Sequence, residues 1–570
     1  MLKLIQILLF IVSPVLLTAQ VVDEKNYTKS VNQYYDYNKV NLQASGHYYK
    51  DELGETTERH GKWKFYDRLG ILQEERNYYR DLLEGKVVLY YANKTMSQEG
   101  YFKAGRQDSV YREWYENGQL KTEGEYLRDQ AVGLWTNYYF DGHLKSEEGI
   151  IDGETNLSSY FAADSLHTQT ILDGNGELFN YYTTGAIKEY YQYENGLKNG
   201  VFEEYSIYGY MLLNGNFVAD QKDGEWNFFY YTGEKEKTSN YKSGVLHGAY
   251  AYYYDSGQLN VKGQYELGKK SGEWQWLNNQ GGKDMTGNFK EDLQHGKWKY
   301  YFENGEISYK AEYKNGLRDG KWDYFYKDGS KFKVGRFEND LKNGNWKTWY
   351  EDGTLLLDGD YVNGLEEGEW KNYWQNGVLK NRSYFTKGQL NGVWESYGMN
   401  SVLSIKGEYK MGFKTGVWEE FFKNGLPKEV ASYKVYSEKS VMNYSVMKDF
   451  EKVESKHNGK FVTYSDKDFK KTEEGTFSKG EKDGEWIAYH PGGKMAAVIS
   501  NYKDGKLDGE MKQFDRSGAI VSEINYKNGV KDGKFLVYDR NGKIVSEKEF
   551  KNGSQVVNGT SSGPGFSPGR

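Results

Sequence analysis

Histidines and carboxylates are the residues of this sequence that could bind a metal ion. The eight histidines are His47, His60, His143, His167, His247, His295, His457 and His490. No two of them have a spacing that would bring them together as metal ligands on one strand. Cysteine is absent, which excludes thiolate metal sites, thiol nucleophiles and disulfide bonds. We therefore predict no metal site and no cofactor, and a structural turn role for His60, His247 and His295, which share one repeat position.

The chain also lacks the patterns that are typical of a catalytic site. No nucleophile-elbow motif is present, and no residue breaks the repeat described below as a catalytic residue usually does. The glycine pair Gly174 and Gly176 is not followed by the helix that a phosphate-binding loop requires. Asp-Gly and Asn-Gly pairs lack the alternating carboxylates of a calcium loop, and hairpin turns explain them. The sequence predicts a protein that is not an enzyme.

The charged residues are mixed along the chain. The 75 basic and 82 acidic residues give a net charge of −7, without long runs of either sign. Such mixing is typical of a solvated surface, and it gives no support to a nucleic-acid partner.

Residues 1–19 resemble a secretory signal peptide. Lys3 precedes an apolar run from Leu4 to Leu17, and Ala19 closes it before the chain becomes polar. We expect cleavage after Ala19 and an exported protein that is periplasmic, attached to the cell envelope or secreted. An uncleaved anchor is the alternative, because Leu17 is larger than the residue usual three positions before such a cleavage site.

A glycine recurs every 24 residues through the middle of the chain. These glycines are Gly176, Gly200, Gly224, Gly248, Gly272, Gly296, Gly320, Gly344, Gly368, Gly392 and Gly416. Five residues after the glycines from Gly200 onward lie Tyr205, Phe229, Tyr253, Leu277, Tyr301, Phe325, Trp349, Tyr373, Tyr397 and Phe421. A fixed period in this range indicates an array of stacked units that contact only their neighbours. Further markers at 61, 85, 109, 133, 459, 484, 509 and 533 extend the array over residues 42–553.

Each unit reads as one β-hairpin. In residues 296–319 two aromatic-rich runs flank Asn304-Gly305, a dipeptide suited to a two-residue turn because both positions tolerate positive φ. Side chains then alternate between the two faces of the sheet. The predicted fold is all-β, an elongated single-layer antiparallel sheet, or β-ribbon, of about 20 stacked 24-residue hairpins.

Counting outward from the turns predicts the cross-strand pairs. Trp298 falls opposite Ala311, and the equivalent pairs are Trp274 with Gly287, Trp322 with Gly335, Trp346 with Gly359 and Trp394 with Gly407. A large ring can cover a small cross-strand residue. A four-residue second loop at 316–319 places Tyr313 opposite Trp322. The residues that define the repeat are Gly272, Trp274, Gly287, Gly296, Trp298, Tyr313, Gly320, Trp322, Gly335, Gly344, Trp346 and Gly359.

The two faces of the sheet differ in character. The tryptophans share one face with a Tyr/Phe column, which makes that face apolar. The other face carries the aromatic residues found five positions after each glycine, among Lys, Glu, Ser and Thr. The candidate binding residues in this column are Tyr253, Tyr301, Phe325, Trp349, Tyr373 and Tyr397. Their rings could stack on sugars or grip an extended peptide, or they could simply brace this face of the sheet.

Four segments depart from the repeat. Residues 20–41 are expected to cap the first hairpin, residues 143–175 contain a degenerate unit, residues 434–458 are expected to form a loop insertion, and the Gly/Ser/Pro-rich residues 554–570 are expected to form a flexible tail.

Segments such as YKSGVLHGAYAYYYDSGQLNVKGQY (241–265) and FKEDLQHGKWKYYFENGEISYKAEYKNG (289–316) resemble MORN repeats, in particular their bacterial variants. The His-Gly step is kept at His60, His247 and His295 and replaced in other units, which departs from the eukaryotic pattern. The resemblance implies an elongated, grooved β-ribbon that serves as a scaffold or partner-binding surface. Many bacterial variants carry the label of YwqK-family antitoxin.

The leading hypothesis is a non-enzymatic, exported repeat scaffold at the cell envelope that binds a protein partner or itself as a homo-oligomer. Its basis is the apolar face, which a single-layer sheet cannot bury without curling or dimerising. One alternative is recognition of an envelope glycan or lipid along an aromatic face. The other is an antitoxin or immunity role, which the family resemblance implies.

Overall fold

The computed structural model describes residues 26–440 and 450–557. The predicted signal peptide lies outside the described residues. The chain divides into two units, residues 1–270 and 271–570, and each unit is described by itself. Within the described ranges no helix is long and apolar enough to cross a membrane.

The described residues form 45 β-strands and no α-helix. The strands that lie wholly in the first unit are β1 (Val31–Tyr34), β2 (Leu42–Asp51), β3 (Gly54–Tyr66), β4 (Leu72–Tyr79), β5 (Leu82–Tyr90), β6 (Met96–Lys103), β7 (Arg106–Trp114), β8 (Leu120–Leu127), β9 (Gln130–Tyr138), β10 (Leu144–Ile151), β11 (Glu154–Phe161), β12 (Gln169–Leu172), β13 (Asn175–Tyr181), β14 (Ile187–Glu194), β15 (Leu197–Tyr205), β16 (Met211–Val218), β17 (Gln221–Phe229), β18 (Lys235–Lys242), β19 (Val245–Tyr253) and β20 (Leu259–Glu266). The boundary between the units falls within β21 (Lys269–Leu277).

The strands that lie wholly in the second unit are β22 (Lys283–Lys290), β23 (Leu293–Tyr301), β24 (Ile307–Lys314), β25 (Leu317–Arg318), β26 (Gly320–Phe325), β27 (Lys331–Glu338), β28 (Leu341–Trp349), β29 (Leu355–Val362), β30 (Leu365–Tyr373), β31 (Leu379–Thr386), β32 (Gln389–Leu390), β33 (Gly392–Tyr397), β34 (Leu403–Lys410), β35 (Phe413–Phe421), β36 (Pro427–Ser440), β37 (Phe450–Tyr464), β38 (Lys471–Ser478), β39 (Glu481–Tyr489), β40 (Ala496–Lys503), β41 (Lys506–Phe514), β42 (Ile520–Lys527), β43 (Val530–Tyr538), β44 (Ile544–Lys551) and β45 (Ser554–Val556).

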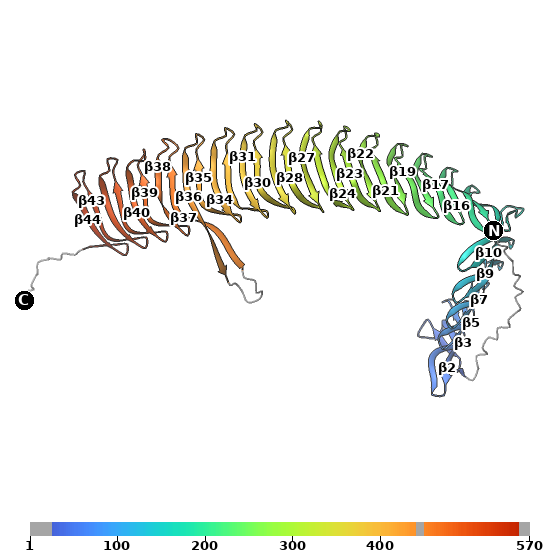
Figure 1. Cartoon of the computed structure of the whole chain (residues 1–570). Coiled ribbons are helices and arrows are strands. Elements are labelled where there is room, and N and C mark those ends of the chain that lie inside the picture. The colour runs from blue at the N-terminus through green and yellow to red at the C-terminus, as the bar shows by residue number, and fades with distance from the viewer. Residues whose placement is uncertain (1–25, 441–449, 558–570) are drawn as a thin grey trace, which may run out of the picture. The chain divides into compact units, whose positions relative to one another are not determined.

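Consecutive strands pair side by side in antiparallel fashion within each unit. In the second unit, for example, β22 pairs with β23 and β23 pairs with β24. Figure 1 shows these strands as a row of hairpins in a single layer. The all-β, single-layer antiparallel fold of consecutive hairpins predicted from the sequence is confirmed.

The turn at Asn304-Gly305 is longer than predicted. Only Gly305 has a positive φ, 87°, and Tyr301 pairs with Ile307 across a register shift. The amide of Gly305 donates to the Phe302 carbonyl at 2.9 Å, so the loop is a three-residue turn that closes on a glycine bulge. The prediction of a two-residue turn at this position is wrong. Asn304 is favoured here because its side chain accepts the Glu306 amide, at 3.1 Å.

The two-residue turn lies at the other connection of each repeat. Asn315 and Gly316 both have positive φ, 50° and 84°, and Lys314 pairs with Leu317 across them. Tyr313 therefore pairs with Arg318 and not with Trp322, which corrects the predicted four-residue loop. The register shifts between the Tyr313–Arg318 pair and the Lys310–Asp323 pair. A bulge there accommodates the extra residues of the second strand.

The predicted cross-strand pairs of the tryptophans are all present. They are Trp298 with Ala311, Trp274 with Gly287, Trp322 with Gly335, Trp346 with Gly359 and Trp394 with Gly407. A tryptophan ring does not cover its own cross-strand partner, however, but a small residue of the preceding hairpin. A Cβ atom on Gly287 would overlap the ring of Trp298, which belongs to the following hairpin, and Trp298 Nε1 donates to the Asn288 carbonyl at 3.1 Å. Each tryptophan therefore ties its own hairpin to the preceding one.

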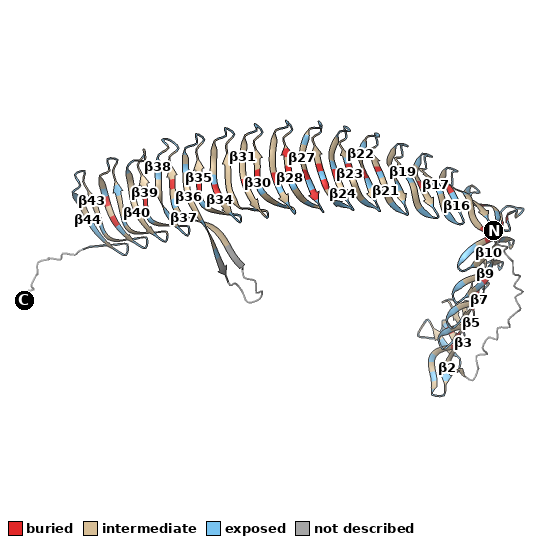
Figure 2. Ribbon diagram, viewed as in Figure 1, coloured by how far each residue is buried: buried red, intermediate tan, exposed pale blue. Residues whose placement is uncertain are grey.

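The tryptophans are buried within the chain itself. Trp226, Trp274, Trp298, Trp322, Trp346, Trp370, Trp418 and Trp486 are all at most 6% exposed. Lysine side chains cover several of the rings, with Nζ 4.2 Å from the ring centroid for Lys222 over Trp226 and 3.7 Å for Lys482 over Trp486. Figure 2 shows buried residues as red segments within successive strands. The expectation that this face needs a second copy to cover it therefore has no support at the tryptophans.

The segment expected to be a loop insertion is a long hairpin. β36 and β37 continue well beyond the repeat and pair from Glu429 with Thr463 as far as Ser440 with Phe450. Residues 434–440 and 450–458 are therefore strand rather than loop, and residues 441–449 lie outside the described residues.

The two ends of the array are also paired. β1, within the expected cap at 20–41, pairs with β2 at the edge of the first hairpin. β45 pairs with β44, so strand continues to Val556 inside the predicted tail, and residues 558–570 lie outside the described residues.

The degenerate unit at 143–175 interrupts the regular pairing. β12 has only four residues, and residues 162–168 join it to β11 as a loop. The Leu157 amide donates to the Gly196 carbonyl at 2.8 Å, which brings β11 near the turn between β14 and β15. A local cluster of Leu157, Tyr160, Ile171 and Leu178 fills this part of the first unit.

Candidate functional site

The candidate binding residues Tyr253, Tyr301, Phe325, Trp349, Tyr373 and Tyr397 lie one per repeat. All six side chains are half-buried. Tyr301 lies three residues after Trp298 on the same strand and so points to the opposite face. The Lys310 ammonium lies 5.2 Å from the centre of the Phe325 ring, and Tyr397 donates its hydroxyl to Glu395 at 2.9 Å. The rings of Phe325 and Tyr397 are therefore engaged by neighbouring charged side chains.

Ion pairs run across the same face. Glu369 contacts Lys371 at 2.5 Å and Arg382 at 3.1 Å, and Arg382 reaches Glu395 at 3.6 Å. The hydrogen bond from Lys371, assisted by those from its other neighbours, lowers the pKa of Glu369 despite its partial burial. The aromatic column thus lies in a charged lattice, which fits the bracing role better than an open platform for sugars.

Sequence reasoning missed a row of exposed leucines, which we call the leucine edge. It consists of Leu293, Leu317, Leu341 and Leu365, and each is 43–48% exposed. Each follows a two-residue turn directly and starts a strand or strand segment. Leu293 Cδ2 would lie 3.4 Å from a Cβ on Gly316, and Leu341 and Leu365 lie close to Gly364 and Gly388 in the same way, so these three leucines rest against the next turn. The 24-residue spacing of these leucines was the signal that could have revealed them.

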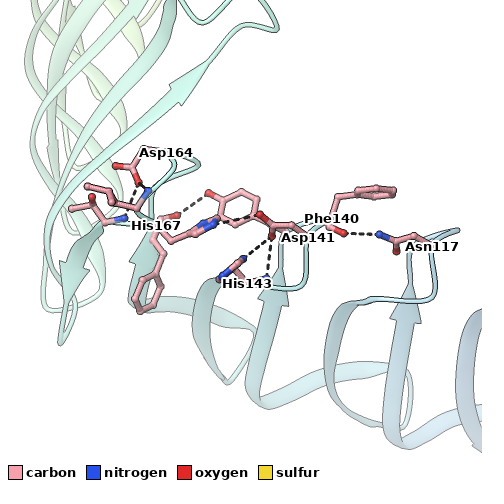
Figure 3. A network of polar contacts seen from close by, with 10 residues as sticks. Asn117, Phe140, Asp141, His143, Asp164 and His167 are labelled. Carbon is pink, nitrogen blue, oxygen red and sulfur yellow. Dashed lines mark hydrogen bonds and ion pairs between the residues drawn. The ribbon is translucent and has the colours of Figure 1, made fainter.

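Three potential metal ligands meet at the interruption of the first unit (Figure 3). Asp141 and His143 come from the turn between β9 and β10, and His167 comes from the loop between β11 and β12. Asp141 Oδ1 lies 3.2 Å from His143 Nδ1, and Asp141 Oδ2 lies 3.4 Å from His167 Nε2. The two imidazole rings stack with centroids 3.9 Å apart. The sequence did not predict this arrangement, because the spacing criterion concerned histidines on one strand, whereas these two lie in a turn and a loop.

Hydrogen bonds hold the segments that carry these three residues. Tyr139 donates its hydroxyl to the Phe161 carbonyl at 2.7 Å, which fastens the turn to the end of β11. Asp164 Oδ1 accepts the amide of Thr168 at 3.0 Å and shapes the loop around His167. The backbone amide of His143, followed by its ring, lowers the pKa of Asp141 by hydrogen bonding to it. Asp141 is therefore an anion at neutral pH.

His60, assigned a structural role from the sequence, is enclosed by aromatic rings. It is buried, and its ring centroid lies 5.3, 5.0 and 5.4 Å from those of Tyr27, Tyr49 and Tyr79. Neither ring nitrogen has a hydrogen-bond partner. Burial lowers the pKa of His60, and the Arg80 guanidinium lowers it further. His60 is held in its neutral form.

We expect the first unit to lose stability as the pH falls below about 6.5, the usual pKa of an unfolded histidine. The unfolded chain takes up a proton at His60 there, whereas the folded chain does not, so stability is full above this pH and declines below it. Denaturant unfolding of wild type and His60→Phe between about pH 7.5 and about pH 5.5 measures this contribution. The variant should show a shallower decline, and an unchanged decline would contradict a neutral buried His60.

The sequence model for the MORN repeat variant matches ten segments of the chain. They are residues 59–78, 107–127, 131–149, 246–267, 294–315, 342–363, 366–387, 482–504, 507–528 and 531–552. The chain is a MORN-repeat protein. Its repeats and its fold fit a repeat scaffold for protein interactions. A comparison of this MORN-repeat protein with curated proteins finds no match.

Two solved structures with some similarity to this MORN-repeat protein are distant from it. One is the crystal structure of TcdB2-TccC3-Cdc42, with 9% identity, a TM-score of 0.12 and coverage of 93% of this chain and 31% of that chain. Another is a Photorhabdus luminescens Tc holotoxin pore, with 11% identity, a TM-score of 0.10 and coverage of 86% and 28%. The MORN-repeat protein thus spans less than a third of either chain. These TM-scores are too low to transfer a fold or a function.

Proposed function

We propose that this MORN-repeat protein is a non-enzymatic, exported scaffold that binds an extended segment of a protein partner along the leucine edge at the cell envelope. The leucine edge is the observation that supports the proposal. Four leucines expose close to half of their surface in successive repeats, whereas the tryptophan face is already covered. The residue pattern of 1–19 supports export.

The spacing of the leucine edge suits an extended peptide. Two strands per repeat, each about 4.8 Å wide, separate successive leucines by about 10 Å. An extended chain in the polyproline II conformation advances about 3.1 Å per residue with three residues per turn, so every third partner side chain would face a leucine. A protein segment can offer apolar side chains at this interval, and the half-buried aromatic column offers no comparable free surface.

Substitution of two leucines by glutamate tests this proposal. A library of random 15-residue peptides displayed on phage is selected on the full chain, and the recovered peptides are titrated against Leu317→Glu/Leu341→Glu. Completing the burial of two half-exposed leucines contributes about 2 kcal/mol, so we expect the affinity to fall at least about tenfold. Leu426→Glu is the matched control, because Leu426 is 44% exposed but follows a turn of the other kind, at Asn424-Gly425.

Equal binding of the selected peptides to the double variant and to wild type would overturn the leucine edge as the binding surface. An equal loss in Leu426→Glu would also overturn it, because the effect would then follow the added charge rather than the location. Selection of no specific peptide would argue against recognition of an extended protein segment.

A further inference from the structure

We propose that Asp141, His143 and His167 bind one divalent transition-metal ion of the zinc type, which clamps the loop between β11 and β12 to the turn between β9 and β10. Two imidazoles and one carboxylate form a donor set that suits Zn²⁺. The ligands come from two segments of the first unit that are separated along the chain by β10 and β11. The proposal is independent of partner binding at the leucine edge.

The distances between the donor atoms fit such an ion. With Zn–N and Zn–O bonds of about 2.0–2.1 Å, the ligand atoms of a tetrahedral site lie about 3.3 Å apart. The carboxylate oxygens of Asp141 lie 3.2 Å from His143 Nδ1 and 3.4 Å from His167 Nε2. All three donor atoms lie within 4.8 Å of one another. Little movement of the carboxylate is therefore needed.

The burial of the three side chains leaves room for further ligands. The Asp141 and His143 side chains are 52% and 61% exposed, whereas His167 is 21% exposed. Water can reach the outer side of the cluster and fill the remaining coordination position. The two imidazole rings must tilt relative to each other when the ion binds. A metal ion lies in the plane of each imidazole that coordinates it, so the two ring planes must cross at the ion. The rings now lie at an interplanar angle of 17°, and the exposed His143 ring is free to tilt.

The position of Asp141 in its repeat also suits a cation. One repeat earlier, the amide of Asn117 donates to the Phe140 carbonyl at 2.7 Å and so connects two turns. Asp141 occupies the equivalent position 24 residues later and offers only acceptor oxygens, which turn toward His167. A cation between Asp141 and His167 would restore a connection between neighbouring segments where the amide donor is missing.

The surroundings of His167 limit the affinity. Its Nδ1 atom is buried without a hydrogen-bond partner. When Nε2 binds a metal, Nδ1 carries the ring proton, and the acceptor that normally orients such a ligand is missing. Outer-shell partners of this kind are worth about 10- to 100-fold in metal affinity. We therefore expect binding in the micromolar range.

Titration of the full, tag-free, EDTA-treated chain with ZnCl₂ by calorimetry tests the site, with Co²⁺ absorption as a probe of coordination geometry. We expect one specific site with a tetrahedral Co²⁺ spectrum. Asp141→Asn and His143→Ala should each weaken binding at least about tenfold. His143 is exposed, so His143→Ala should fold normally. His490→Ala is the control, since this ring lies in a turn elsewhere and contacts the Phe514 carbonyl at 2.8 Å.

Hydrogen exchange of residues 162–168 measures the clamp separately from the affinity. Saturating Zn²⁺ should slow exchange there in wild type and not in His143→Ala. Failure to bind Zn²⁺ at tens of micromolar, or binding that is equal in all three variants, would overturn the site and leave an Asp141–His167 ion pair alone. Binding without any change in exchange would overturn the clamp.

Discussion

Replacing Trp298 by alanine is expected to remove about 3–5 kcal/mol of local stability from the second unit, the usual cost of truncating a buried tryptophan. The ring is 1% exposed, covers Gly287 of the preceding hairpin and donates to the Asn288 carbonyl. Hydrogen exchange measures the effect. Amides of β22 and β23 should exchange roughly a hundred- to several-thousand-fold faster, because each 1.4 kcal/mol is a factor of ten.

Trp349→Ala is the matched control for this substitution. Trp349 is the same residue type in the same unit, but it is half-buried on the opposite face. Its removal should cost markedly less. The effect of Trp298→Ala should also fade over one or two hairpins on either side, because stacked repeats contact only their neighbours. Uniform acceleration across the unit, or equal effects of the two substitutions, would contradict inter-hairpin coupling by the tryptophans.

Gly124→Ala is expected to destabilise the first unit by about 1–3 kcal/mol, the usual cost of overpacking. Gly124 lies in β8 beneath the ring of Trp135, and an added Cβ would overlap that ring. The stiff aromatic ring cannot move aside without losing its packing against Tyr111 and Tyr126. Denaturant unfolding monitored by tryptophan fluorescence measures the loss.

Gly149→Ala provides the comparison from the next hairpin. Gly149 lies in β10, and a Cβ there would have its nearest neighbour, the Asn156 carbonyl oxygen, at an ordinary 3.9 Å. Neither glycine has a positive φ, so both substitutions test space rather than backbone conformation. Gly149→Ala should be close to neutral or slightly stabilising, because alanine restricts the unfolded chain. Similar losses at the two positions would show that strand glycines matter here for another reason.

The turns illustrate where local reasoning succeeded and where it failed. Asn-Gly dipeptides marked the ends of strands correctly, because turn residues act within a few positions of the chain. The predicted lengths of both turns, two residues at Asn304-Gly305 and four residues at 316–319, were wrong, however. Asn304-Gly305 closes a three-residue loop, whereas Asn315-Gly316 forms the two-residue turn. Both dipeptides tolerate positive φ, so the choice depends on the hydrogen bonds that each turn makes with the next repeat, such as that from Asn304 to the Lys327 carbonyl at 2.9 Å.

For the candidate sites, too, local sequence patterns revealed some features and missed others. The aromatic column was found from its period, but the sequence left a binding role and a bracing role open, because the ion pairs around the rings depend on the neighbouring strands. The leucine edge carried the same 24-residue signal and was passed over, because exposure cannot be read from a hydrophobic residue type alone. His143 and His167 are 24 residues apart, and side chains of neighbouring turns meet at about this spacing, as Asn304 meets Lys327, so the repeat period was the signal that could have revealed this pair.

The sequence by itself determined that this protein is an array of β-hairpins. It also determined the pairing across each hairpin, since period, alternation and turn residues act over short distances along the chain. Only the tertiary structure decided which glycine each tryptophan covers, where the bulges absorb extra residues and which ligands meet at the interruption. These features depend on packing between successive hairpins. A shift of one residue there changes the neighbours of every side chain while leaving each hairpin's own pattern intact.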